Sequence, residues 1–179
     1  MKRVSLFFTI FLVFAFILSG CNGVTAPEGV TLKAFQDNEG FFSLLVPNDV
    51  KVGDVRHTEG LLFIWLKSEK HSVMISLVNV EKEEAYNSVT DLSSFVQTIL
   101  QEEQNFVQNL NVITQPATYK DGMMCKISFT VGGETKTTLH FDKKISETNY
   151  IDLEVGLEGG VDESVFSQIV DSLKVLKTL

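Results

Sequence analysis

The 179-residue chain has only two cysteines and three histidines, residue types from which many catalytic and metal sites are built. Its two cysteines cannot supply a disulfide framework. A zinc site commonly pairs ligands at short spacings, and no two of His57, His71 and His140 are close in sequence. No Gly-x-Ser-x-Gly elbow occurs, and the glycines of residues 156–160 lack the spacing and the lysine of a phosphate loop. We therefore predict no catalytic residue, no metal ion and no cofactor.

Positive charge is also scarce, with 15 basic residues against 23 acidic ones and a formal net charge of −8. An anionic protein is repelled by nucleic acid and by anionic lipid head groups. We therefore predict no nucleic-acid partner and no attachment to a membrane through a basic patch.

A long apolar run occurs at the N-terminus, where Lys2 and Arg3 precede residues 4–17. The run has the length of a signal-peptide core and is shorter than the roughly 20 apolar residues of a membrane span. The alternative is an uncleaved N-terminal anchor. In both cases the basic start keeps the N-terminus cytoplasmic and places the following chain outside.

This leader ends in Leu18-Ser19-Gly20-Cys21, which resembles the lipobox of bacterial lipoproteins. The resemblance implies cleavage after residue 20 and a lipid on Cys21, and several acyl chains hold a protein stably on a bilayer. We therefore predict a signal peptide over residues 1–20, lipid attachment at Cys21, and a location on the extracytoplasmic face of the cell membrane. Without residues 1–20 the formal charge is −10.

The rest of the chain divides into a tether and one domain. Residues 22–33 show no periodicity, so residues 21–33 are predicted to be the lipidated cysteine and a tether. Residues 34–179 have the length of a single domain. Within them, residues 61–66 and 73–80 are apolar on both faces and must be covered on both sides, so Trp65 should be largely buried.

Helical and strand patterns then alternate along the domain. Apolar residues recur at helical spacing from Leu92 to Leu110 after an N-cap at Thr90 or Asp91, and again from about Asp162 to Leu176. Asp121-Gly122 and Gly132-Gly133 separate three strands as tight hairpins do, and a strictly alternating strand follows over Asn149–Leu157. The predicted class is α+β, a mainly antiparallel sheet with helices packed on it.

Two segments resemble PsbP-like proteins, a group that includes the PsbP, Mog and DcrB types. Residues 40–47 are similar to the opening strand of that group, and residues 165–173 are similar to its last helix. The resemblance covers residues 35–177 and implies an α/β/α sandwich. It also implies an adaptor or stabilising role without a shared catalytic site.

Taken together, these patterns predict a membrane-anchored lipoprotein that acts as a non-enzymatic binding or stabilising module of the cell envelope, with an envelope or membrane protein as partner. One alternative is an envelope hydrolase whose site forms only in the fold, for example in a pocket where His140 meets Asp152 or Glu154. Another is a ligand carrier for a transporter, for which a single domain offers no hinge between lobes.

The later strands predict where a partner would bind. Each has one apolar and one polar face, as in a sheet that is open on one side. If the hairpin register is kept, that open face carries Lys126, Lys136, His140, Tyr150, Asp152 and Glu154. The alternative to a binding surface is that this polar face is solvated and has no function. Cys125 lies on the apolar side and is predicted to be a small buried hydrophobic residue.

Overall fold

The computed structural model describes residues 29–157 and 162–179. The predicted signal peptide and Cys21 lie outside the described residues. The helical elements are η1 (Glu84–Tyr86), α2 (Leu92–Phe106) and α3 (Glu163–Ser172). The strands are β1 (Leu32–Gln36), β2 (Phe42–Pro47), β3 (Lys51–His57), β4 (Leu61–Lys67), β5 (His71–Asn79), β6 (Gln108–Tyr119), β7 (Gly122–Val131), β8 (Glu134–Lys144), β9 (Asn149–Leu157) and β10 (Lys174–Val175).

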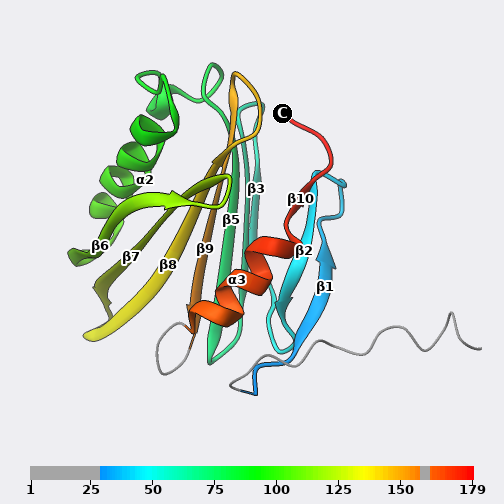
Figure 1. The fold of residues 1–179 in the computed structure, drawn as a ribbon, viewed down its shortest axis with the longest axis vertical. Coiled ribbons are helices and arrows are strands. Elements are labelled where there is room, and N and C mark those ends of the chain that lie inside the picture. Colours follow the sequence, from blue (N-terminus) through cyan, green and yellow to red (C-terminus); the bar gives the residue numbers. More distant parts are fainter. Residues whose placement is uncertain (1–28, 158–161) are drawn as a thin grey trace, which may run out of the picture.

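Within the described residues the strands form two antiparallel sheets (Figure 1). The large sheet has the order β3-β4-β5-β9-β8-β7-β6, and the small sheet has the order β1-β2-β10. The two predicted hairpins are present. Gly132 and Gly133 join β7 to β8 with φ values of 61° and 84°, a conformation that glycine adopts without strain. The predicted α+β class with a mainly antiparallel sheet is therefore confirmed.

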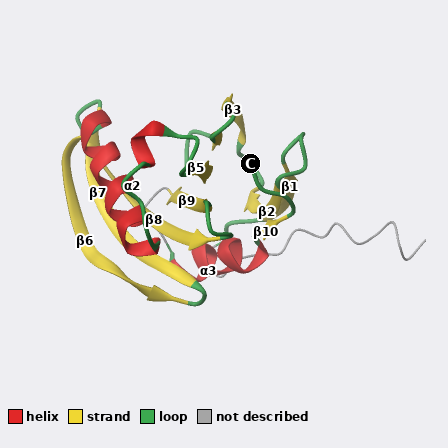
Figure 2. Cartoon of the chain, turned by 90° about the horizontal axis from the view of Figure 1, so that it is seen from above, coloured by secondary structure: helices red, strands yellow, loops and turns green. Residues whose placement is uncertain are grey.

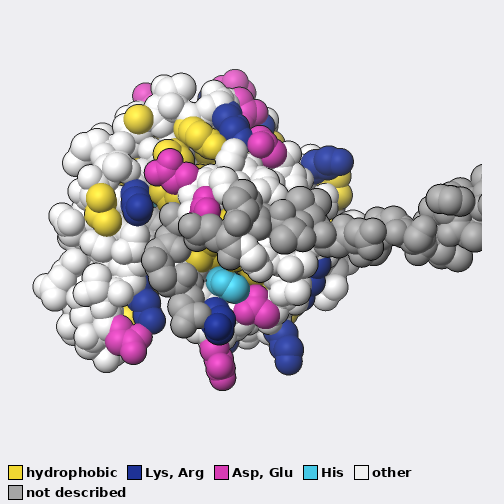
Figure 3. Space-filling model, turned by 60° about the horizontal axis from the view of Figure 1, so that its bottom comes forward, with side chains coloured by type: hydrophobic (Ala, Val, Ile, Leu, Met, Phe, Trp, Pro, Cys, Tyr) yellow, Lys and Arg dark blue, Asp and Glu magenta, His cyan; other side chains and the backbone are white. Residues whose placement is uncertain are grey.

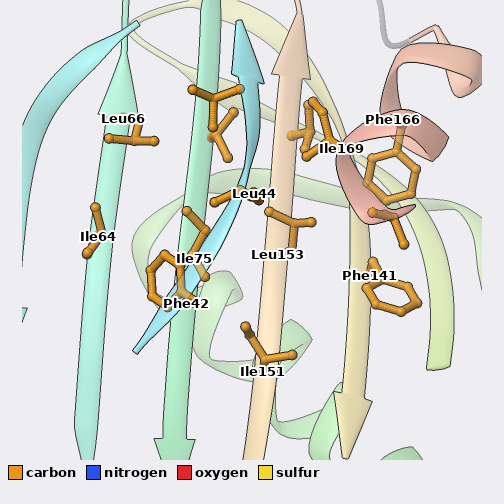
Figure 4. Close-up of a cluster of buried hydrophobic side chains, with 14 of the residues drawn as sticks. Phe42, Leu44, Ile64, Leu66, Ile75, Phe141, Ile151, Leu153, Phe166 and Ile169 are labelled. Atoms are coloured by element: carbon orange, nitrogen blue, oxygen red, sulfur yellow. The ribbon is translucent and has the colours of Figure 1, made fainter. Parts of the chain in front are cut away.

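A layer packs on each face of the large sheet, although β3 at its edge remains largely exposed. The small sheet and α3 pack on one face, and α2 packs on the other, where β6, β7 and β8 curve around it (Figure 2). The main core lies between the large sheet and the layer of α3 and the small sheet (Figure 4). It includes Phe42, Leu44, Ile64, Leu66, Ile75, Phe141, Ile151, Leu153, Phe166 and Ile169.

Both helices begin where the sequence predicts and end earlier. The side chain of Asp91 accepts a hydrogen bond from the backbone N–H of Ser94 and caps α2, and Asp162 caps α3 in the same way. The expectation that α2 continues to Leu110 is wrong, because residues after Phe106 enter β6 and pair with β7. The apolar periodicity persists there, but sheet pairing decides the conformation.

Two further expectations are corrected. The predicted tether includes Leu32, which is fully buried and begins β1, so the folded domain starts before residue 34. Trp65 is only half-buried, because α2 covers the β6–β9 half of its face and leaves the β4 side partly uncovered. The ammonium group of Lys67 lies over Trp65 instead, with Nζ 4.2 Å from the ring centroid.

Candidate functional site

The expected open polar face is covered by a helix. The six residues predicted to form it were Lys126, Lys136, His140, Tyr150, Asp152 and Glu154, and the structure buries the last four. Helix α2 lies over this part of the sheet, and Phe95 of α2 stacks on Tyr150 with 4.8 Å between ring centroids. The expectation of a single open docking face is therefore wrong.

The register of the β7–β8 hairpin also separates Lys126 from the other five residues. Cys125 pairs with His140, and Lys126 pairs with Leu139, so Lys126 lies on the opposite face from the histidine. Polar residues occur on both faces of β7, so polarity alone does not place Lys126 on the face of His140. Lys136 is exposed near the hairpin turn, 2.6 Å from Glu134.

The structure brings five titratable side chains together beneath α2. This acid–histidine cluster consists of Glu103 from α2, His140 and Asp142 from β8, and Asp152 and Glu154 from β9. Cross-strand pairing sets two of the contacts, because His140 lies opposite Glu154 and Asp142 lies opposite Asp152. Side chains from three elements therefore converge on one buried point.

His140 lies at the centre of this cluster and is fully buried. Its Nε2 is 3.5 Å from Glu103 Oε1 and 4.0 Å from Glu154 Oε2, and its Nδ1 is 3.4 Å from Asp152 Oδ1. Thr138 Oγ1 also lies 3.2 Å from Nε2. The imidazole is thus surrounded by carboxylates on both ring nitrogens.

Several polar atoms of the cluster lack hydrogen-bond partners among the described residues. They are Glu103 Oε2, His140 Nδ1, both carboxylate oxygens of Asp142, and Asp152 Oδ1. Buried polar groups in folded proteins are nearly always paired, because an unpaired one costs roughly 1–3 kcal/mol. Such a concentration of unpaired atoms distinguishes this place from the rest of the described core.

Burial and mutual repulsion raise the pKa values of three carboxyl groups in the cluster. Burial raises the pKa of Glu103 to about 8, and it raises the pKa values of Asp142 and Glu154 as well. Burial alone would lower the pKa of His140, but the surrounding carboxylates, Glu103 first, outweigh it and raise that pKa to about 10. Glu103, His140, Asp142 and Glu154 therefore hold their protons more tightly than they would in water.

Two members of the cluster, Glu103 and Asp142, were not predicted from the sequence. Glu103 occupies the apolar stripe of α2, four residues after Ile99 and seven after Val96, and a charge on such a stripe is the signal that identifies it. Asp142 continues the alternation of Thr138 and His140 along β8. Neither signal shows that the two side chains meet.

The other residues considered from the sequence, His57, His71 and Cys125, are not members of the acid–histidine cluster. His57 Nδ1 lies 2.8 Å from Glu39, and His71 Nδ1 lies 2.8 Å from Asp49, both near the surface. Cys125 is buried and free of any disulfide, as predicted, and burial raises its thiol pKa to about 12.

A cavity of about 320 Å³ lies between α3 and β8, away from the cluster. Its lining includes Lys120 and Lys143, but these pair with Asp171 and Asp121 respectively. The paired charges leave no excess positive charge to attract an anion. On the part of the surface visible in Figure 3, basic and acidic side chains are likewise interspersed.

The fold is PsbP-like. The chain resembles the solution structure of cyanobacterial PsbP (CyanoP) from Synechocystis sp. PCC 6803, with a TM-score of 0.51 and 13% identity over 87% of this chain and 96% of that one. A crystal structure from Bacteroides thetaiotaomicron VPI-5482 matches with a TM-score of 0.46 and 13% identity, over 80% of this chain and 48% of that one.

No protein-family model matches the sequence. No curated protein matches it either. Across residues 29–157 and 162–179, no helix combines the length and the apolar character needed to cross a membrane.

Proposed function

We propose that this chain is a lipid-anchored extracytoplasmic protein whose PsbP-like domain acts as a non-enzymatic binding or stabilising module of the cell envelope. The observation that carries the proposal is the lipobox at Leu18–Cys21 directly after an apolar leader. Ten residues separate Cys21 from Leu32, the first residue of β1. If extended, they would span at most about 35 Å, which keeps the domain close to the bilayer.

The partly uncovered part of the sheet supports a binding role. Phe63, Trp65 and Met74 share one face of β4 and β5 and are half-buried, and the main strand contacts of α2 are with β6, β7 and β8. The guanidinium carbon of Arg56 lies 5.6 Å from the Phe63 ring centroid. Aromatic residues, Met and Arg are enriched at the centres of protein interfaces. We propose that this strip contacts a protein partner in the envelope.

One observation favours a second candidate, an envelope hydrolase, because His140 does lie against Asp152 and Glu154. A substrate would have to reach an imidazole that is fully buried under α2. The binding role is therefore the better supported of the two. Hydrolysis of envelope material by the purified chain, lost on replacing His140, would reverse this order.

The anchor is tested by metabolic labelling with radioactive palmitate in cells. Cys21→Ala should abolish labelling and leave a larger precursor that retains the leader. Cys125→Ala is the matched control and should label normally, because that thiol is buried in the domain. Normal labelling of the Cys21 variant would refute the anchor.

The partner strip is tested by cross-linking in intact membranes followed by mass spectrometry. Arg56→Glu with Phe63→Ser should remove the cross-linked partner while far-UV circular dichroism stays unchanged. Phe106→Ser is the control, because Phe106 is 83% exposed at the far end of α2. Equal recovery of the same partner by both variants would exclude the strip.

A further inference from the structure

We propose that Glu103, His140 and Glu154 bind a divalent transition-metal ion between α2 and the large sheet. One ligand atom from each of the three side chains lies within 4.8 Å of the other two. The ligands come from α2, β8 and β9, so a bound ion would connect the helix to two neighbouring strands. The proposal is independent of the partner-binding role.

The distances between these ligand atoms are close to those of a metal site. Ligand atoms about 2.0–2.2 Å from a tetrahedral metal lie roughly 3.3–3.6 Å from one another. Here the separations from His140 Nε2 are 3.5 Å to Glu103 and 4.0 Å to Glu154. Rotation of the two glutamate side chains by less than about 1 Å at the oxygen atoms would complete the geometry.

A further carboxylate lies where a metal-bound histidine needs one. A metal-ligating histidine almost always donates its other ring N–H to a carboxylate or carbonyl, which fixes the tautomer. Asp152 Oδ1 lies 3.4 Å from His140 Nδ1, and neither atom has a hydrogen-bond partner in the described part of the chain. A small approach of these two atoms satisfies both and makes Nε2 the acceptor atom of the ring, where a metal ion would replace the contact with Thr138 Oγ1.

The excess of carboxyl groups over the single imidazole in the cluster favours the binding of a cation. Four carboxylates surround one imidazole, and Glu103, with a side chain 21% exposed, is the most accessible of the three ligands. Burying ionised carboxylates without compensation is costly, and they are retained in proteins when they are paired or coordinate metals. A divalent ion would offset the charge of the two ligating glutamates, and Glu103 gives it access from the helix side.

The ligand set indicates which ions would bind. An imidazole ligand suits Zn, Fe, Ni and Cu, whereas Mg and Ca prefer ligand sets made of oxygen atoms. We therefore expect Zn²⁺ to bind and Mg²⁺ to bind much more weakly. Binding should release protons, because the ligands must be deprotonated to coordinate the ion.

The test uses the full-length lipidated protein in detergent, purified without a histidine tag and stripped with a chelator. Isothermal titration with Zn²⁺ should give about one ion per chain, with proton release seen as a dependence of the heat on the buffer. Co²⁺ should give a visible absorption spectrum from the same site. The surface pairs of His57 and His71 are removed in a control, His57→Gln with His71→Gln, which should retain this binding.

Two variants decide the assignment. Asp152→Asn should weaken Zn²⁺ binding by roughly 10–100-fold, as loss of a supporting carboxylate does. Glu103→Gln, which removes a ligand at the least buried position, should weaken it at least as much. Three results would each overturn the proposal: unchanged Zn²⁺ affinity in folded Glu103→Gln protein, loss of binding in the surface-histidine control, or no binding by the unaltered chain. The last result would show that protons alone fill the cluster.

Discussion

The contact that holds α2 on the sheet can be broken by Phe95→Ala. Phe95 is fully buried, and its ring lies 4.8 Å from Tyr150 and 5.6 Å from Tyr86, measured between centroids. Truncating a buried Phe to Ala costs about 3–5 kcal/mol, and the lost aromatic stacking favours the upper part of that range. We expect the free energy of unfolding to fall by about 4 kcal/mol and Tm to fall by about 8–16 °C.

Urea unfolding followed by far-UV circular dichroism and by the fluorescence of Trp65, the sole tryptophan of the chain, measures this loss. Amide hydrogen exchange should also rise in α2 before the sheet opens, because the helix loses its main anchor. Phe106→Ala on the same helix is the control and should change stability by less than about 0.5 kcal/mol, since Phe106 is exposed. Equal effects of the two variants, or a Phe95 cost under about 1.5 kcal/mol, would refute the packing of α2 over the cluster.

Three further predictions follow. Cys21→Ala should give a larger, unlipidated precursor by gel mobility, and normal processing would contradict the lipobox. In the presence of a chelator, the free energy of unfolding should fall as pH rises from about 4.5 to about 10, because folded Glu103 and His140 keep their protons up to pKa values of about 8 and about 10, whereas the unfolded chain releases them at lower pH. Glu103→Gln should flatten this pH dependence below pH 8, where the rise of the Glu103 pKa from 4.5 corresponds to at most about 5 kcal/mol. An unchanged pH profile in this variant would show that the Glu103 carboxyl titrates normally. Gly122→Ala should destabilise the β6–β7 hairpin by about 1–3 kcal/mol in urea unfolding, because the Cβ of the new alanine would lie 2.3 Å from the carbonyl oxygen of Asp142. Unchanged stability would mean that the backbone moves at little cost.

Much of the local structure follows from short stretches of sequence. The cap at Asp91 and the alternation of Asn149–Leu157 agree with the structure. So does the tight turn at Gly132-Gly133, whereas the β6–β7 turn is formed by Lys120 and Asp121, and Gly122 already pairs with Tyr119 in the sheet. Each depends on residues a few positions apart, so the pattern and the conformation it specifies are close together in the chain.

The register of the β7–β8 hairpin was also accessible from the sequence. A two-residue loop at Gly132-Gly133 places Val131 opposite Glu134, and counting outward from that pair brings Cys125 opposite His140. The same count would have excluded Lys126 from the face of the histidine. The expected grouping relied on polarity alone, which does not distinguish the two faces of a strand that has polar residues on both.

The sequence by itself determined most of the element types and the alternation that separates Ile151 and Leu153 from Asp152 and Glu154. Only the tertiary structure decided that α2 covers the polar face of β9, and that Glu103 meets a histidine 37 positions along the chain. The physical reason is that periodicity fixes which side chains share a face, whereas the layer that covers the face depends on packing between distant segments. A polar strand face therefore has the same sequence pattern whether it lies in water or beneath a helix, where its carboxylates become a buried cluster.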